Sequence, residues 1–182
     1  MNDDMKVFIV GIDDIDKKEI AECVAKYDDN YSVCPMFTSD INKRDLHSPN
    51  KYYIDNDSVS LAFKNNALLY VTTNEVYSEG VTFDDMYNSD IVHMSISEFN
   101  TISENFLNTF NALIIWVDVK KHSNKALNNE LFEIKYFQNY LDKGTHKYMY
   151  FLDESPEDIA KTICEYLSGD EETRKHLLEE NS

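Results

Sequence analysis

The sequence predicts an α/β domain of three layers, in which a mostly parallel central sheet lies between helices. Short apolar runs rich in β-branched residues alternate with longer segments whose apolar residues recur at helical spacing. Most of these runs are continuously apolar, which is typical of strands buried on both faces of a parallel sheet. At 182 residues the chain is expected to form a single domain, 1–182.

The first predicted elements are a strand and a helix joined by a tight loop. Residues 5–12, MKVFIVGI, read as a buried strand, and residues 16–27 follow as a helix that Asp13 or Asp14 can cap. The apolar positions that repeat at helical spacing along this helix are Ile20, Cys23, Val24 and Tyr27. A strand, a tight loop and a helix together open a βαβ unit.

The middle third of the chain is less regular. Strands are predicted at 31–37 and 67–73, and the polar stretch 38–50 is expected to be a mobile loop. Residues 57–64 are compatible with a short helix or a strand. Residues 74–90 contain a glycine and a helix-like segment.

The last part of the chain is more regular. The predicted strands are 91–96, 112–119 and 148–152, and the predicted helices are 97–110, 123–142 and 156–167. The apolar positions of the long helix are Leu127, Leu131, Ile134, Phe137 and Leu141.

Local signals mark the ends of these last helices. Gly144 is placed to end the long helix, Ser155 to cap the next one, and Gly169 to end it. Pro156 suits the first helical position. The acidic tail 170–182 is expected to form a short helix with frayed ends.

The charge balance argues against a nucleic-acid partner. The chain has 34 acidic and 17 basic residues and a net charge of −17. Affinity for a phosphate backbone comes mainly from lysine and arginine, so nucleic-acid binding is not expected. The two arginines are Arg44 and Arg174, and arginine is the residue best suited to clamp phosphate.

Cysteine usage and the apolar runs indicate a soluble intracellular protein. Cys23, Cys34 and Cys164 are widely spaced, which favours neither a disulfide framework nor a zinc site. No apolar run is long enough to span a membrane, and the acidic start of the chain is unlike a signal peptide. The bias toward Asn, Asp, Ile, Tyr and Lys is typical of an AT-rich genome, such as that of a low-GC bacterium or of a virus that infects one. A cytoplasmic location, or a place in a virion, is therefore expected.

The loop after the first strand is where a ligand of an open α/β sheet is expected. It reads GIDDIDKK, residues 11–18. Against the phosphate-loop pattern GxxxxGK[ST], Gly11 and Lys17 match, whereas Asp16 replaces the second glycine and Lys18 the hydroxyl residue. Two like charges about 5 Å apart repel by roughly 3 kcal/mol at an effective dielectric constant of about 20, so the aspartates of this loop disfavour a triphosphate.

The carboxyl-terminal half resembles the end of a P-loop nucleoside or nucleoside-monophosphate kinase. In ALIIWVDVKKHSNKALNNELFEIKYFQNYLDKGTHKYMYFLDESPEDIAKTICEYL, a buried strand, a lid-like segment, a long helix, a last strand and a PED-type helix follow one another. The resemblance implies a P-loop-kinase-like fold. Such kinases usually carry arginines in the lid and the following helix, but residues 120–146 contain only lysines as basic residues. Phosphoryl transfer depends on such charge neutralisation. The resemblance therefore implies the kinase fold without the ability to transfer a phosphoryl group.

Other candidate sites are weaker. Asp118 ends the strongest strand and could hold Mg²⁺, although a single aspartate at a strand end is more often a solvated terminus. The histidines His93, His122 and His146 lack metal-ligand spacing. Asp13 and Asp14 would also suit the Mg²⁺ site of a receiver-like signalling module, but no aspartate follows the strand at 67–73 as that module requires.

The sequence thus leaves three functional hypotheses. The first is a non-catalytic kinase-like domain that needs no cofactor and serves as a structural or interaction component, bound to a protein partner or to its own copies. Aromatic residues of the middle third are expected to supply part of an exposed interface, and these are Tyr52, Tyr53, Phe63, Tyr77, Phe83 and Tyr87. The alternative is a nucleotide-binding protein or kinase that uses Gly11, Lys17 and Lys18 for phosphate and Asp13, Asp14 and Asp118 for Mg²⁺. The receiver-like module ranks third.

Overall fold

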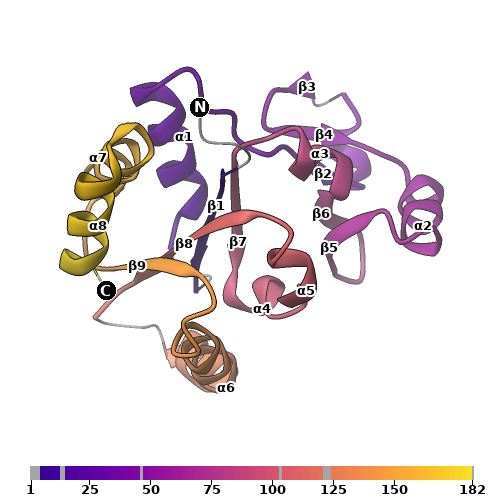
Figure 1. Cartoon of the computed structure of the whole chain (residues 1–182). Helices are drawn as coiled ribbons and strands as arrows, with labels where there is room; N and C mark the ends of the chain where they lie inside the picture. Colours follow the sequence, from indigo (N-terminus) through magenta and orange to yellow (C-terminus); the bar gives the residue numbers. More distant parts are fainter. Residues whose placement is uncertain (1–4, 13–14, 46, 103, 121–123, 182) are drawn as a thin grey trace.

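A computed structural model describes residues 5–12, 15–45, 47–102, 104–120 and 124–181. It confirms the predicted α/β architecture with a parallel central sheet (Figure 1). Four strands pair in parallel in the order β7-β1-β8-β9. Their bounds are Met5–Gly11 for β1, Ile91–Ser95 for β7, Asn111–Asp118 for β8 and Lys147–Leu152 for β9.

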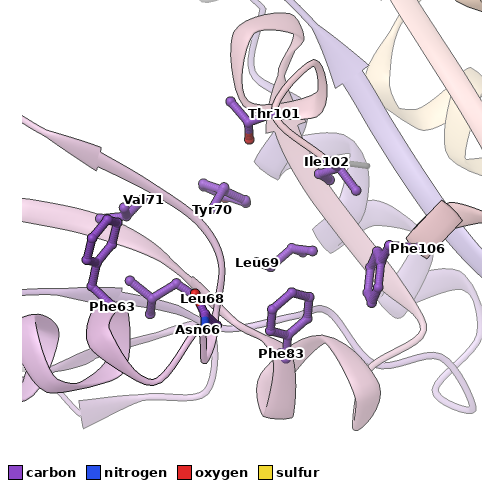
Figure 2. Close-up of a pocket in the computed structure, with 10 residues that line it drawn as sticks. All are labelled: Phe63, Asn66, Leu68, Leu69, Tyr70, Val71, Phe83, Thr101, Ile102 and Phe106. Carbon is purple, nitrogen blue, oxygen red and sulfur yellow. The ribbon is translucent and has the colours of Figure 1, made fainter. Parts of the chain in front are cut away.

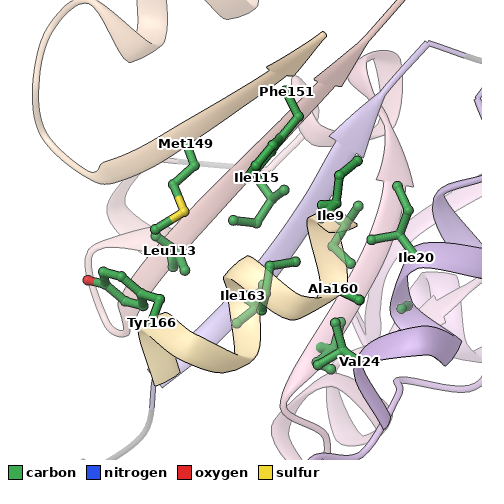
Figure 3. Packing of buried hydrophobic residues seen from close by; sticks show 14 of the residues in the cluster. Ile9, Ile20, Val24, Leu113, Ile115, Met149, Phe151, Ala160, Ile163 and Tyr166 are labelled. Atoms are coloured by element: carbon green, nitrogen blue, oxygen red, sulfur yellow. The ribbon is translucent and has the colours of Figure 1, made fainter. Parts of the chain in front are cut away.

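Helices cover both faces of the parallel sheet. The helices that pack on one face are α1 (Lys17–Tyr27), α7 (Pro156–Ser168) and α8 (Glu171–Glu180). Those on the other face are α4 (Ile96–Phe99) and α6 (Asn124–Leu141). Figure 3 shows Ile9 and Ile115 of the sheet facing Ile163 of α7, and all three side chains are fully buried. Burial of this kind stabilises the fold by about 1.5–3 kcal/mol for each large apolar side chain.

A second, mixed sheet lies beside the parallel sheet and was not predicted (Figure 1). Its strand order is β3-β4-β2-β6-β5, with parallel pairing between β2 and β4 and antiparallel pairing elsewhere. The strands are β2 (Met36–Thr38), β3 (His47–Ser48), β4 (Lys51–Tyr53), β5 (Leu68–Thr73) and β6 (Ser78–Thr82). The remaining short helices are η1 (Ile41–Lys43), α2 (Asn56–Lys64), α3 (Phe83–Tyr87) and α5 (Glu104–Leu107).

Two predictions about the first helix were wrong. The residue that caps α1 is Asp16, whose Oδ1 accepts a hydrogen bond from the Glu19 N–H at 2.9 Å, and not Asp13 or Asp14. Tyr27 does not belong to the buried face, because it occupies the last position of the helix and is exposed.

The predicted strand 31–37 was wrong in extent and in place. Only Met36–Thr38 forms a strand, and it belongs to the mixed sheet. Val33 makes a single parallel bridge with Ile91, and Pro35, which has no N–H to donate, follows two residues later. The polar stretch 38–50 was expected to be a loop but carries η1 and β3, and the ambiguous segment 57–64 is helical.

Two further boundaries differ from prediction. The single helix expected at 97–110 is two short helices, because α4 starts at the capping box of Ser95 and Glu98 and ends after one turn at Asn100. Strand β6 was missed, since its glycine argues against a strand. Gly80 is required there because a Cβ at this position would lie 2.4 Å from Tyr70 O.

The predicted helix ends in the last part of the chain were confirmed. Ser155 caps α7 with Pro156 in its first turn, Gly169 follows its last residue, and Gly144 follows the end of α6. The tail forms α8 from 171 to 180. Phe137 and Leu141 of α6 are buried as predicted, whereas the side chains of Leu127 and Leu131 lie outside the described residues.

The three cysteines carry free thiols, two of them buried and Cys164 half-buried. Among the helices that the structure describes, none combines the length and the apolar character needed to cross a membrane.

Candidate functional site

The topology brings three of the sequence-predicted residues to one edge of the parallel sheet. Gly11 ends β1, Lys17 begins α1, and Asp118 ends the neighbouring strand β8. A Cβ at Gly11 would lie 2.8 Å from Val117 O and 3.5 Å from Lys17 Cδ. Glycine therefore allows β1, β8 and the lysine stem to approach closely. This edge is where open α/β sheets bind ligands.

Lys17 is turned into its own loop. The side chain is only 9% exposed, and its Nζ donates to Ile12 O at 2.6 Å and to Ile15 O at 3.1 Å. Backbone N–H groups of the loop also bond inward, from Ile15 to Ile12 O at 3.2 Å and from Lys17 to Ile15 O at 3.0 Å. A phosphate-binding loop instead directs its N–H groups and its lysine at the ligand.

The other predicted residues of this loop do not complete a phosphate site. Lys18 is exposed on α1 and forms an ion pair with Glu22 at 3.3 Å. Asp13 and Asp14 lie outside the described residues. In the described part of the chain, no group of three or more histidine, cysteine, aspartate or glutamate side chains is placed to hold a metal ion.

Asp118 belongs to a small polar cluster that the sequence did not reveal. Its Oδ1 accepts from the Val119 N–H at 2.8 Å, and its Oδ2 accepts from the Tyr150 hydroxyl at 3.3 Å. Burial, followed by the charge of Asp118, raises the pKa of Tyr150. The tyrosine therefore stays protonated and can donate to Asp118.

Asp153 extends this cluster from the end of β9. Its N–H donates to Asp118 O at 3.1 Å, and its carboxylate accepts from the Lys120 N–H at 2.9 Å and pairs with the Lys120 amine at 3.4 Å. Parallel strands that neighbour each other bring their carboxyl ends together. The cluster of Asp118, Tyr150 and Asp153 could have been predicted only by knowing that β8 pairs with β9.

His93 lies under α1, on β7 opposite Ile9 of β1. Burial is the main reason that its pKa is lowered to about 4, and Lys17 and Lys18 lower it further, whereas Asp16 and Glu22 raise it. The imidazole is therefore neutral at pH 7. His93 is a buried packing residue, while His146 stacks on Tyr140 at 5.9 Å and His122 lies outside the described residues.

A second charged group lies on the mixed sheet. Glu79 accepts from the Lys51 amine at 2.6 Å, and Lys43 lies 3.6 Å from the same carboxylate oxygen. Burial alone would raise the pKa of Glu79, but the bond and charge of Lys51, together with Thr38 and Lys43, outweigh it, so the pKa is lowered. The Lys43 amine also lies 5.7 Å from the centre of the Tyr77 ring. The amines of Lys43 and Lys51 are thus held by a carboxylate.

Arg174 connects the two C-terminal helices, α7 and α8. Its Nε and Nη2 donate to the carbonyl oxygens of Tyr166 and Leu167, each at 2.9 Å. These are carbonyls of the last turn of α7, which has no further helical N–H to bond. One of the two arginines thus ties α8 to α7.

The architecture defines a class of fold, which is P-loop-kinase-like. Among solved structures, the chain is similar to the guanylate kinase from Anaplasma phagocytophilum, with a TM-score of 0.51 and 12% sequence identity. The similarity covers 96% of this chain and 86% of that one. At this identity the likeness concerns the fold. No protein-family model and no curated protein matched the sequence.

Proposed function

We propose that the chain is a kinase-like domain that does not transfer phosphate and that acts as a structural or interaction component of a larger assembly, such as a virus particle. The observation that supports this proposal best is the position of the Lys17 amine, which is bonded to Ile12 O and Ile15 O. To reach a phosphate, the amine would have to give up both bonds. Ile12 O and Ile15 O would each keep one backbone donor, so the cost is the loss of two hydrogen bonds from a charged amine, about 1.5–3 kcal/mol each.

The acids of the loop support the same proposal. Asp16 stands where a phosphate loop has its second glycine, and its carboxylate occupies the N-terminal turn of α1 by accepting from Glu19. That turn is the place where a phosphate would receive backbone N–H bonds. A phosphate would have to compete with a fixed negative charge.

The distribution of arginine supports it as well. The transferred phosphoryl group needs positive charge aimed at it. No arginine occurs between residues 120 and 146, and Arg174 is bonded to the end of α7.

The alternative is a nucleotide-binding protein, and one observation favours it. Gly11, Lys17 and Asp118 lie at the same edge of the sheet, as in a site where Lys17 would bind phosphate and Asp118 would hold Mg²⁺. This alternative predicts that Mg²⁺ and nucleotide stabilise the protein together.

Thermal unfolding of the purified chain separates the two functions. The panel consists of nucleoside mono- and triphosphates, each with and without Mg²⁺. The proposal predicts an unchanged melting temperature throughout. A ligand at about 100 times its Kd stabilises by about 2.7 kcal/mol, which would raise the melting temperature by roughly 5–10 °C.

Lys17→Ala and Lys18→Ala form a matched pair of variants. Without ligand, Lys17→Ala is expected to lower the melting temperature because Ile12 O and Ile15 O lose a donor, while Lys18→Ala removes only an exposed ion pair. A Mg²⁺-dependent rise that is present in Lys18→Ala and absent in Lys17→Ala would overturn the proposal and establish the alternative.

A further inference from the structure

An apolar groove of about 470 Å³ runs beside β5, on the side of the mixed sheet that faces α4 and α5 (Figure 2). It lies apart from the loop that follows β1. Figure 2 shows Phe63 and Val71 at one end of the groove and Ile102 and Phe106 at the other. Among the residues that the structure describes, none of the side chains that line it is charged.

The groove follows the edge of β5. Tyr70 and Val71 are consecutive residues of this strand, and both line the groove. Successive side chains of a strand point to opposite faces of the sheet, so a groove that touches both must include the strand edge. β5 is the last strand in the order β3-β4-β2-β6-β5, and that edge has no neighbouring strand in the described part of the chain.

The register shows which backbone groups face this edge. Asn74 N–H donates to Tyr77 O at 3.0 Å, so these two residues form a hydrogen-bonded pair at the end of the β5–β6 hairpin. Hydrogen-bonded and non-hydrogen-bonded pairs alternate along an antiparallel ladder. The pairs Thr73–Ser78 and Val71–Gly80 are therefore of the second kind. Val71 and Thr73 therefore direct their backbone N–H and C=O groups away from β6.

The edge lacks most of the features that usually prevent pairing. Proteins protect open edges with charged side chains, prolines or bulges. The sequence of β5, LLYVTT, has no charge and no proline, and its one irregularity lies between Leu68 and Tyr70, before the outward groups of Val71 and Thr73. The outer end of β5 can accept another strand.

Aromatic side chains continue the groove. Phe63 on α2, which lines one end of it, is 67% exposed. Phe83 and Phe106 pack edge to face at 5.0 Å, and Phe110 extends this group at 5.2 Å from Phe106. Contiguous apolar surface of this kind marks an interaction site.

The charges around the groove indicate the chemistry of the partner. Glu98 is fixed beside it by a bond from the Thr72 hydroxyl at 2.8 Å, and Asp84 follows Phe83 in α3. Lys64, which follows Phe63, is the basic residue nearest in sequence to a residue that lines the groove. With a net charge of −17, a second copy of the chain would be repelled, whereas a basic partner would be attracted.

We propose that the open edge of β5 and the adjoining groove bind an extended segment of a partner protein, in which apolar residues alternate with lysine or arginine. The segment adds to the mixed sheet as a further strand, its backbone pairing with Val71 and Thr73 and its apolar side chains entering the groove. This proposal rests on the interaction role proposed above, for which it names the surface.

A fluorescent octapeptide of alternating valine and lysine is the probe, and its anisotropy is measured against the full chain. Phe63→Lys is expected to weaken binding by about tenfold or more, because it removes an apolar contact and adds a repelling charge. Phe132→Lys is the matched control, since Phe132 is 80% exposed on α6, outside the groove. It makes the same change of charge and is expected to alter binding by less than about twofold.

Two further peptides test the mode of binding. N-methylation of every peptide nitrogen, which removes strand pairing whichever edge faces β5 but keeps the charge, is expected to abolish binding. A peptide of valine and glutamate is expected not to bind. Equal binding of the N-methylated peptide, or equal loss in Phe63→Lys and Phe132→Lys, would overturn the proposal.

The remaining outcomes separate this proposal from the proposed function. Absence of peptide binding together with an unchanged melting temperature in the nucleotide panel would refute the β5 surface and leave the interaction role standing. A Mg²⁺-dependent nucleotide response would refute the interaction role whatever the peptide does. Sedimentation of the chain alone, with dimers that Phe63→Lys dissociates, would make a second copy the occupant and overturn the proposal of a basic partner.

Discussion

The two sheets of this protein differ in how completely they are covered. In the parallel sheet, consecutive residues of β1 are buried, and helices pack on both faces. Its edge strand β9 is also partly closed, because Tyr150 N–H donates to Asn181 O at 2.6 Å. In the mixed sheet, β4 is half-buried along its length, β5 is exposed at its outer end, and its edge is open.

This difference indicates a division of roles. Burial of apolar side chains is the main source of stability, so the parallel sheet is expected to hold most of the folding free energy. In the described part of the chain, the mixed sheet keeps exposed aromatic residues and a strand edge without a neighbouring strand, which cost stability but would suit the proposed interaction role.

Polar contacts connect the two regions. The Lys6 amine on β1 donates to Tyr87 O at 3.0 Å and to Ser89 O, and the Tyr70 hydroxyl on β5 donates to His93 O on β7 at 3.4 Å. Within the mixed-sheet region, Asp85 accepts from the Tyr52 hydroxyl at 2.5 Å. Burial, followed by the bond to Asp85, raises the pKa of Tyr52, which keeps this donor protonated.

The largest expected effect is in the parallel sheet. Ile115→Ala removes a fully buried side chain and is expected to lower the free energy of unfolding by about 2–5 kcal/mol. Val71→Ala, at a half-buried position of β5, is expected to cost about 1 kcal/mol or less. Urea unfolding measures both, and similar losses at the two positions would contradict the division of roles.

A smaller effect is expected at the connection between the sheets. Lys6→Met keeps the apolar stem but leaves Tyr87 O and Ser89 O without their donor, at a cost of about 1–3 kcal/mol. Lys161→Met removes only an exposed pair with Glu165 and is expected to cost less than about 0.5 kcal/mol. Urea unfolding measures both losses of free energy. Equal losses in the two variants would show that the buried Lys6 amine does not stabilise the connection between the sheets.

Another expected effect is a slope with pH. The pKa of His93 is about 4 in the folded state, below its ordinary value of 6.5, so the unfolded chain binds the proton more readily between these values. The free energy of unfolding should therefore fall as the pH falls through this window, by at most about 1.4 kcal/mol per pH unit from this residue.

The His93→Gln variant isolates this contribution, because the carboxylates titrate in both proteins. The difference in stability between wild type and variant, measured by urea unfolding from pH 7 to pH 4, should shrink or reverse as the pH falls. A constant difference would mean that His93 is not buried as a neutral base.

The candidate site was predictable in its parts and not in its geometry. The match of Gly11 and Lys17 to a phosphate loop follows from spacing, and the strand end at Asp118 follows from the apolar run before it. The inward bonds of Lys17 and the cluster of Asp118, Tyr150 and Asp153 depend on contacts that local sequence does not encode.

The sequence by itself determined the parallel sheet and most of the helices that follow its strands, the exception being the pair of short helices after β7. Buried strands give continuous apolar runs, and helices repeat at 3.6 residues with capping residues at their ends, so these elements are local patterns. Only the tertiary structure decided the mixed sheet. Its strands are short, contain residues such as Gly80, and are stabilised by partners distant in sequence, as when β2 pairs with β4 and β6. Such pairing depends on the neighbouring strand more than on intrinsic preference.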